Sequence, residues 1–198
     1  MTIIALYNNY PLASFNHIEK SGSYTLPETA QLKNGKPFFI PDYAVPCLIE
    51  VHFAVRISRL GRNIGRRFAN RYYDAATVVP HFFSPSMLEL AQKNGLPWSS
   101  AMGFDSSVPI GDFLSLSSDE VQHQAFSLSV DGKPVMKGNT ANMLQSVDEI
   151  IADVSRFHTL RRGDLLLTGA PVVPLPITMN SRVEAFLNEE KVLSFNVK

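Results

Sequence analysis

An alternation of apolar and polar residues from Leu48 to Ser58 constrains the fold of this chain more than any other feature. Apolar side chains occupy every second position, and they are Ile49, Val51, Phe53, Val55 and Ile57. Successive side chains of a strand point to opposite faces, so the pattern predicts a strand with one face in the core. Glu50 and His52, two residues apart, are then expected to project together from its other face.

Similar patterns predict further strands. Phe126–Val130 alternates in the same way and ends at Asp131-Gly132, a strong hairpin signal. Leu165–Leu167 and Leu193–Val197 are also expected to be strands.

Helices are fewer. Apolar residues at three- and four-residue spacing predict an amphipathic helix over 142–157, with Thr140 as its N-cap and Gly163 beyond its end. A shorter helix is expected over 86–93, stopped by Asn94-Gly95. Because the strands come in runs, the chain predicts an α+β fold that is mostly β, not a doubly wound parallel sheet.

Composition narrows the class of protein. A length of 198 residues predicts one domain over 1–198, with 45% hydrophobic residues to form its core. Basic and acidic residues balance at 18 each, which argues against a nucleic-acid partner. No apolar run approaches the length that spans a bilayer, and the first residues do not resemble a signal peptide. The single cysteine, Cys47, excludes an internal disulfide and is expected to be packed. We therefore expect a cytoplasmic protein without a membrane partner.

Two clusters of ionisable residues allow more than one interpretation. Glu50 and His52 could begin a metal or acid/base site, but alternating strands commonly have a solvated face, and the residues alone favour that second interpretation. Six arginines lie between Arg56 and Arg71 with no acidic residue among them. They could bind an anion, although a solvated loop and helix face is the interpretation that the neutral chain favours. His158, near the end of the predicted long helix, is expected to favour the helix dipole.

An ordered series of short motifs resembles the fumarylacetoacetate hydrolase family over nearly the whole chain. Asn9-Tyr10, Lys36–Ile40 and Ile49–Val55 come first in this series. The later motifs are Gly95–Trp98, Phe104-Asp105, Val108–Gly111, Val130–Gly132, Gly138–Thr140 with Met143, Gly163-Asp164 and Thr168–Pro171. The resemblance implies a mixed, largely antiparallel β core, as a roll or sandwich, with a few short helices.

In that family a divalent metal, usually magnesium or manganese, is held by three carboxylates. The resemblance places Glu50 at the first ligand, His52 at the second and, by counting without gaps, His81 at the third. Two imidazoles and one carboxylate suit zinc, iron, nickel or copper better than the all-oxygen shell that magnesium prefers. The alternative is that the site has decayed and that the two histidines are incidental.

Other family positions are replaced. The catalytic histidine of the family falls on Ala13, which leaves His17 and Glu19 as the nearest acid/base candidates. The lysine before Phe-Asp is Met102, and the threonine of Thr-Gly-Thr-Pro is Ala170. By the same resemblance, Asn9 and Tyr10 are expected to bind the substrate. Arg56, on the same strand face as His52, is a candidate partner for a substrate carboxylate.

The resemblance implies an enzyme that acts on small 2-oxo or enol acids through C–C hydrolysis, decarboxylation or isomerisation. The alternative function is a catalytically silent family member that works as a metal-binding or scaffold protein. Family members are commonly homodimers, so a homodimer is expected here, with Phe82-Phe83 and Val172-Val173 as apolar candidates for the interface.

Overall fold

The structure, a computed structural model, describes residues 1–11, 21–33 and 35–198. In this part of the chain the larger sheet has the order β2 (Gly22–Leu26), β1 (Ile3–Tyr7), β10 (Leu165–Leu167), β4 (Cys47–Ile57), β5 (Tyr73–Phe83) and β7 (Leu114–Ser115), with β11 (Leu175–Ile177) paired to β4. A smaller sheet has the order β13 (Glu190–Asn196), β12 (Arg182–Leu187), β8 (Ala125–Val130) and β9 (Lys133–Asn139). A short parallel pair joins β3 (Gln31–Lys33) to β6 (Val108–Ile110).

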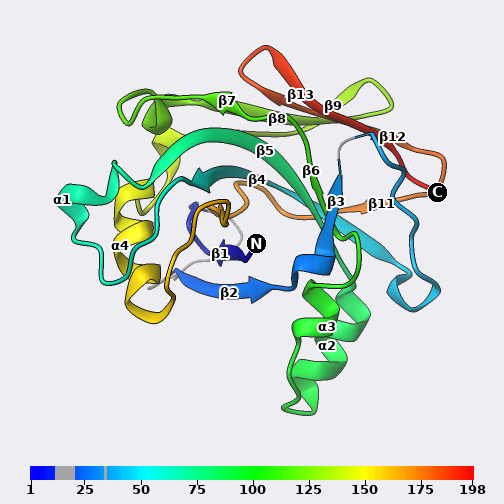
Figure 1. The fold of residues 1–198 in the computed structure, drawn as a ribbon. Coiled ribbons are helices and arrows are strands. Elements are labelled where there is room, and N and C mark those ends of the chain that lie inside the picture. Colours follow the sequence, from blue (N-terminus) through cyan, green and yellow to red (C-terminus); the bar gives the residue numbers. More distant parts are fainter. Residues whose placement is uncertain (12–20, 34) are drawn as a thin grey trace.

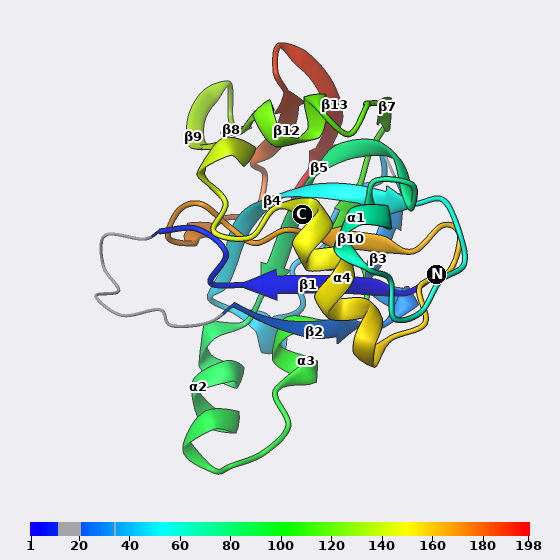
Figure 2. The ribbon, with the colours of Figure 1, turned by 90° about the vertical axis from the view of Figure 1, so that its left-hand side faces the viewer.

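Short helices border these sheets. The α-helices are α1 (Arg66–Ala69), α2 (Pro85–Lys93), α3 (Ser99–Met102) and α4 (Val147–Phe157). Single 3₁₀ turns are η1 (Glu28–Ala30), η2 (Asp42–Ala44), η3 (Glu120–His123) and η4 (Thr140–Asn142). The smaller sheet lies on one side of the larger sheet, and α2 and α3 lie on the other (Figures 1 and 2). Most neighbouring strands are antiparallel, so the predicted mixed α+β fold is confirmed.

Both faces of β4 are covered. Val51 and Phe53 are fully buried on the face that packs against the smaller sheet, in a core that also contains Leu128. The opposite face carries Ala54, fully buried with residues of β1, β5 and β10, and His52, only 1% exposed. The interpretation of a solvated second face is therefore wrong around Glu50 and His52, which the curled sheet and the helices beyond it enclose, whereas Arg56 near the end of β4 is 41% exposed.

The predicted strands and the shorter helix are confirmed. Phe126–Val130 forms β8, and its hairpin to β9 turns at Asp131 and Gly132, with φ angles of 52° and 74°. Two consecutive positive φ values match a type I′ turn, whose twist suits the strands on either side. Helix α2 ends at Lys93, where Asn94 is the C-cap and Gly95 has a φ of 63°.

The long helix α4 begins later than its apolar spacing predicts. Ser146 is its N-cap: the Ser146 hydroxyl accepts a hydrogen bond from the Glu149 N–H, and the Glu149 carboxylate accepts one from the Ser146 N–H. The backbone N–H of Ser146 contributes most, and its hydroxyl adds to it, in holding the pKa of Glu149 below its usual value. Thr140 opens the 3₁₀ turn η4 instead, so its assignment as the helix N-cap is wrong. The capping box explains the difference, because it satisfies the first free N–H groups of the helix at Ser146.

Several of the clustered arginines contact acidic or aromatic side chains. Arg56 pairs with Asp74 and Arg66 pairs with Glu149, while Arg67 and Arg71 lie over the ring of Phe68. Among the described residues, no helix is long and apolar enough to cross a membrane.

The residues suggested for an interface divide into two groups. Phe82 and Phe83 are buried inside the chain, so that part of the suggestion is wrong. They lie on β5, whose two faces are both covered. Val173 is 55% exposed and stays available for contact with a partner.

Replacing the N-cap of α4 tests its role. Ser146→Ala removes the hydroxyl of the capping box, and we expect a loss of about 1 kcal/mol of unfolding free energy and a drop in Tm of about 2–4 °C. Thermal unfolding followed by circular dichroism measures both. Ser100→Ala, at an exposed position of α3, is the control and should stay within about 0.5 kcal/mol of the parent protein. Equal stability of the two variants would contradict the capping role.

Candidate metal centre

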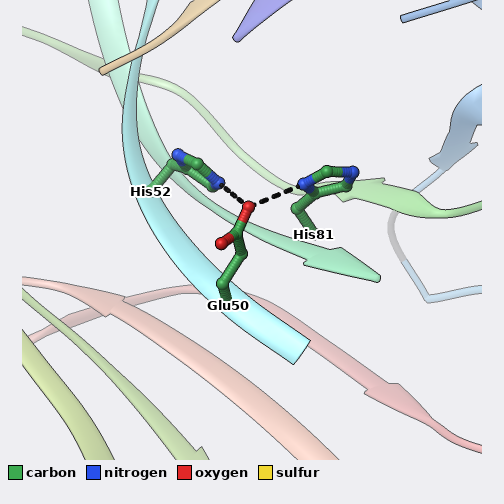
Figure 3. Close-up of side chains that lie close together, drawn as sticks. All are labelled: Glu50, His52 and His81. Carbon is green, nitrogen blue, oxygen red and sulfur yellow. Dashed lines mark hydrogen bonds and ion pairs between the residues drawn. The ribbon is translucent and has the colours of Figure 1, made fainter. Parts of the chain in front are cut away.

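The register of β4 and β5 brings together three ionisable side chains. Glu50 lies directly opposite His81 in this antiparallel pair, and His52 lies two residues from Glu50 on the same face of β4. One Glu50 oxygen, Oε1, is 3.0 Å from Nε2 of His52 and 2.9 Å from Nδ1 of His81 (Figure 3). One ligand atom from each residue lies within 4.8 Å of the others. The structure thus groups the three residues that the resemblance had picked out as ligands.

The histidine rings are held inside the protein. His81 is fully buried, and His52 is 1% exposed, whereas the Glu50 side chain keeps 14% of its surface accessible. Nδ1 of His52 is buried and has no hydrogen-bond partner in the described part of the chain. Glu50 and His52, but not His81, line the cavity described below.

A backbone carbonyl fixes the orientation of His81. Its Nε2 lies 2.6 Å from the carbonyl oxygen of Met102, the last residue of α3. A carbonyl oxygen only accepts hydrogen bonds, so Nε2 carries the proton and Nδ1 faces Glu50. This is the usual arrangement of a metal-binding histidine, which donates its second ring N–H to a backbone or carboxylate oxygen.

Nδ1 of His81 and Oε1 of Glu50 face each other and require a proton or a cation between them. Nδ1 of neutral His81 presents a lone pair, and so does the ionised Glu50 oxygen 2.9 Å away. Two lone pairs repel unless a second proton sits on His81 or a cation binds both atoms. Two imidazole nitrogens and one carboxylate are also a donor set that binds Zn²⁺ or Fe²⁺. The residues present therefore fit a divalent metal ion.

Electrostatics keep the Glu50 carboxyl ionised. Burial by itself raises the pKa of Glu50, but the charges and hydrogen bonds of His52 and His81 outweigh this effect and hold the pKa well below its usual range. An ionised carboxylate is the form that binds a metal.

A cavity of about 520 Å³ opens beside this group. Glu50 and His52 form part of its lining, and aromatic and aliphatic side chains supply much of the rest. Its volume falls within the range of roughly 300–1,000 Å³ that is typical of small-molecule sites. Met102 and Ala170, which stand where the resemblance expected a lysine and a threonine, both line it.

The other predicted site residues that the structure describes do not line this cavity. His17 and Glu19 lie outside the described residues, so their role as proton-transfer groups stays a prediction. Arg56 lies four residues along β4 from His52, where its guanidinium bonds to Asp74 at 3.0 Å and lies over the ring of Phe113. An arginine held in this way at the far end of the strand is not brought to the cavity by the structure.

Asn9 and Tyr10 are buried just beyond the end of β1. The Asn9 amide donates to the carbonyl oxygens of Thr168 and Gln145 and accepts from the Gln145 N–H, at distances of 2.9, 3.2 and 2.8 Å. Tyr10 is 1% exposed, and its hydroxyl has no partner among the described residues. Asn9 thus ties three chain segments together. The expectation that these two residues bind the substrate stays a prediction, and their neighbours Tyr7 and Asn8 line the cavity instead.

Paired variants separate a structural from a binding role at this position. Asn9→Ala leaves buried backbone groups without partners, and we expect a loss of about 2–3 kcal/mol of unfolding free energy. Tyr10→Phe removes a buried hydroxyl that has no partner among the described residues, so stability should change by less than about 0.5 kcal/mol or rise. Urea titration measures both. A strongly destabilised Tyr10→Phe would show that the hydroxyl has a partner and would contradict this account.

Some features of the site had no signal in the sequence. The Met102 carbonyl is a backbone group, so residue type does not reveal it. Tyr24 and Trp98 line the cavity, and their rings meet edge to face with centroids 5.2 Å apart. Trp98 belongs to one of the quoted motifs, but only the pairing of β2 with β1 shows that Tyr24 comes to its side.

Comparison with known proteins identifies the family. The family model described as fumarylacetoacetate (FAA) hydrolase, C-terminal, matches residues 6–195, and the chain belongs to this family. The mitochondrial oxaloacetate tautomerase of Mus musculus is 32% identical over 173 residues, which cover 87% of this chain and 78% of that protein. The oxaloacetate tautomerase of Escherichia coli K12 is 29% identical over 179 residues, covering 85% and 80% of the two chains.

Solved structures share the fold. Fumarylpyruvate hydrolase from Pseudomonas aeruginosa, solved with Mn²⁺ and pyruvate, superposes with a TM-score of 0.89 at 22% identity, covering 100% of this chain and 89% of that one. A 5-carboxymethyl-2-hydroxymuconate delta-isomerase from Mycobacterium smegmatis gives 0.86 at 22% identity, covering 99% and 78%. At these identities the likeness shows the fold.

Proposed function

We propose that this protein is a metal-dependent enzyme acting on a small 2-oxo or enol acid, by C–C hydrolysis, decarboxylation or isomerisation. The observation that carries the proposal is the convergence of Glu50, His52 and His81 at the edge of a cavity sized for a small molecule. The names of the relatives support it, because two of them are oxaloacetate tautomerases. Residues with a purely structural role would not need a buried carboxylate that is shared by two imidazoles beside an open cavity.

Glu50, His52 and His81 would hold the divalent ion. When bound, the ion supplies a Lewis acid that polarises the carbonyl oxygen of a 2-oxo acid. The Met102 carbonyl keeps Nδ1 of His81 directed at Glu50. The ionised carboxylate of Glu50 balances part of the positive charge.

The cavity walls and a proton-transfer group complete the proposed machinery. Apolar walls exclude water from the reacting atoms, which strengthens electrostatic interactions inside the cavity. We propose His17 or Glu19 as the group that moves a proton to or from the carbon next to the carbonyl. Asn9, Tyr10 and Arg56 keep their proposed roles in substrate binding, which would require Arg56 to leave Asp74.

The donor set favours particular metals. Magnesium prefers an all-oxygen shell, whereas two imidazoles suit a softer ion such as Zn²⁺ or Fe²⁺. We therefore propose Zn²⁺ or Fe²⁺ as the ion at this site, in place of the magnesium or manganese that the family resemblance implies.

A silent family member is the second candidate function. The replacement of family positions by Met102 and Ala170 favours it, since these apolar side chains cannot manage protons or hold a carboxylate. Such a protein would keep the fold and a metal and act as a binding or scaffold protein. A turnover assay distinguishes this silent protein from an enzyme.

Metal content tests the ligand assignment. Glu50→Leu and the double variant His52→Ala, His81→Ala should each lower bound metal at least about tenfold after dialysis against buffered Zn²⁺ or Fe²⁺. Elemental analysis of the purified proteins measures this. Glu89→Leu on the exposed face of α2 and His123→Ala in an exposed turn are the matched controls and should retain metal. Full occupancy in Glu50→Leu would refute the assignment.

Turnover tests the proposed activity. The protein is assayed with acylpyruvates and with oxaloacetate, in separate preparations loaded with Mn²⁺, Zn²⁺ or Fe²⁺. We expect activity with at least one metal, reduced about a hundredfold or more in Glu50→Leu. Inactivity with every metal would remove the enzyme and leave the silent scaffold.

The homodimer and the cytoplasmic location stay predictions. Val173 is an exposed apolar residue that could contribute to a dimer interface, whereas Phe82 and Phe83 cannot, because they are buried within the chain.

A further inference from the structure

The cavity beside Glu50 has walls that are mainly apolar. The side chains that form these walls are Leu6, Tyr24, Phe83, Leu88, Trp98 and Met102. Burial of apolar ligand surface against such walls is favourable by roughly 25 cal/mol per Å². A ligand anchored at Glu50 and His52 therefore gains affinity from any apolar group that reaches them.

The aromatic walls are already arranged. The Tyr24 ring meets Trp98 edge to face at 5.2 Å and lies 6.4 Å from the His81 ring, which is 6.2 Å from the ring of Phe83. Tyr24 and Trp98 are half-buried, so each still presents surface to the cavity. Packed rings lose little freedom when a ligand binds, so these walls favour a flat or branched hydrocarbon group.

Positive charge is missing from the lining. Among the described residues that line the cavity there is no lysine and no arginine, and Gln92 is a neutral polar group at its rim. Arg56, proposed above for a substrate carboxylate, pairs with Asp74 and does not line the cavity. A carboxylate placed between apolar walls without a cationic partner would lose its hydration uncompensated. The described lining therefore favours an uncharged group in the part of a ligand that points away from Glu50.

Resting on the proposed function, we propose that the substrate is a monocarboxylic 2-oxo acid with an uncharged apolar tail, aryl or branched alkyl. Trp98 is the wall that determines this preference. Dicarboxylic 2-oxo acids such as oxaloacetate bind less well, although two relatives of the chain are oxaloacetate tautomerases.

Two ligands of equal size test the tail. α-Ketoisocaproate and oxaloacetate have the same number of non-hydrogen atoms, and an isopropyl group in the first replaces a carboxylate in the second. Pyruvate supplies the shared head group without either tail. Trp98 is the single tryptophan of the chain, so its emission reports directly on ligands that enter this cavity.

Titration of the Zn²⁺-loaded protein should show a change in Trp98 emission with α-ketoisocaproate. We expect α-ketoisocaproate to bind at least about tenfold more tightly than oxaloacetate, the gain expected from burying one branched alkyl group. Calorimetry on Trp98→Ala should show α-ketoisocaproate weakened about tenfold and pyruvate changed by less than about twofold.

Substitution of Gln92 provides a second, independent variant at an exposed position of α2. Gln92→Arg adds a cation at the rim and should improve oxaloacetate binding about tenfold, whereas the uncharged Gln92→Met should not. This pair keeps the test decisive if Trp98→Ala fails to fold.

The outcomes distinguish a failure of the proposed function from a failure of the inference about the substrate tail. If pyruvate does not bind with any metal, the proposed function fails, and the inference fails with it. If pyruvate binds but oxaloacetate binds as tightly as α-ketoisocaproate, only the inference fails. Binding of α-ketoisocaproate without a change in Trp98 emission would place it elsewhere and would also overturn the inference.

Discussion

The antiparallel pairing of β4 with β5 is the constraint on which the candidate site depends. Its register sets Glu50 against His81, and the two-residue period of a strand adds His52 on the same face. A slip of one residue would turn one strand's side chains to the opposite face and separate the group. Two long strands fix this register because a one-residue slip would turn Glu50 and His52 into the apolar core that Val51 and Phe53 occupy.

Burial of both faces also explains why the polar residues of β4 are informative. In a sheet with one solvated face, a carboxylate and a histidine at alternate positions carry no meaning. Here the second face is enclosed, and His52 and His81 have almost no exposed surface. Polar side chains buried at this cost need partners: the Met102 carbonyl accepts from His81, and Oε1 of Glu50 lies within hydrogen-bond distance of both rings, where a proton or a cation completes the contact.

The sequence predicted local features well because they depend on local physics. Alternation was enough for β4, and Asp131-Gly132 was enough for the hairpin of β8 and β9. Counting without gaps along the motif series picked out His81, and the register of β4 and β5 places His81 opposite Glu50. The start of α4 was missed because the apolar spacing also extends before Ser146, whereas the capping box at Ser146 decides where the helix begins.

Long-range features could not be predicted in this way. The parallel pairing of β1 with β10 joins segments from the two ends of the chain, and no local pattern encodes it. The burial of Phe82 and Phe83, suggested for an interface, follows from strands that pack on both sides of β5. The Met102 carbonyl acts through the backbone, so its residue type carries no signal.

Helix α3 links the ligand group to the cavity wall. Met102 at its end accepts the hydrogen bond from His81, and Trp98 at its start is the N-cap whose carbonyl accepts from the N–H groups of Ala101 and Met102. The Ala101 carbonyl in turn accepts from the Ser84 N–H, which ties the helix to the end of β5. One short helix therefore sets both the direction of His81 and the position of the indole wall. A ligand packed against Trp98 would therefore contact the helix whose other end orients Nδ1 of His81.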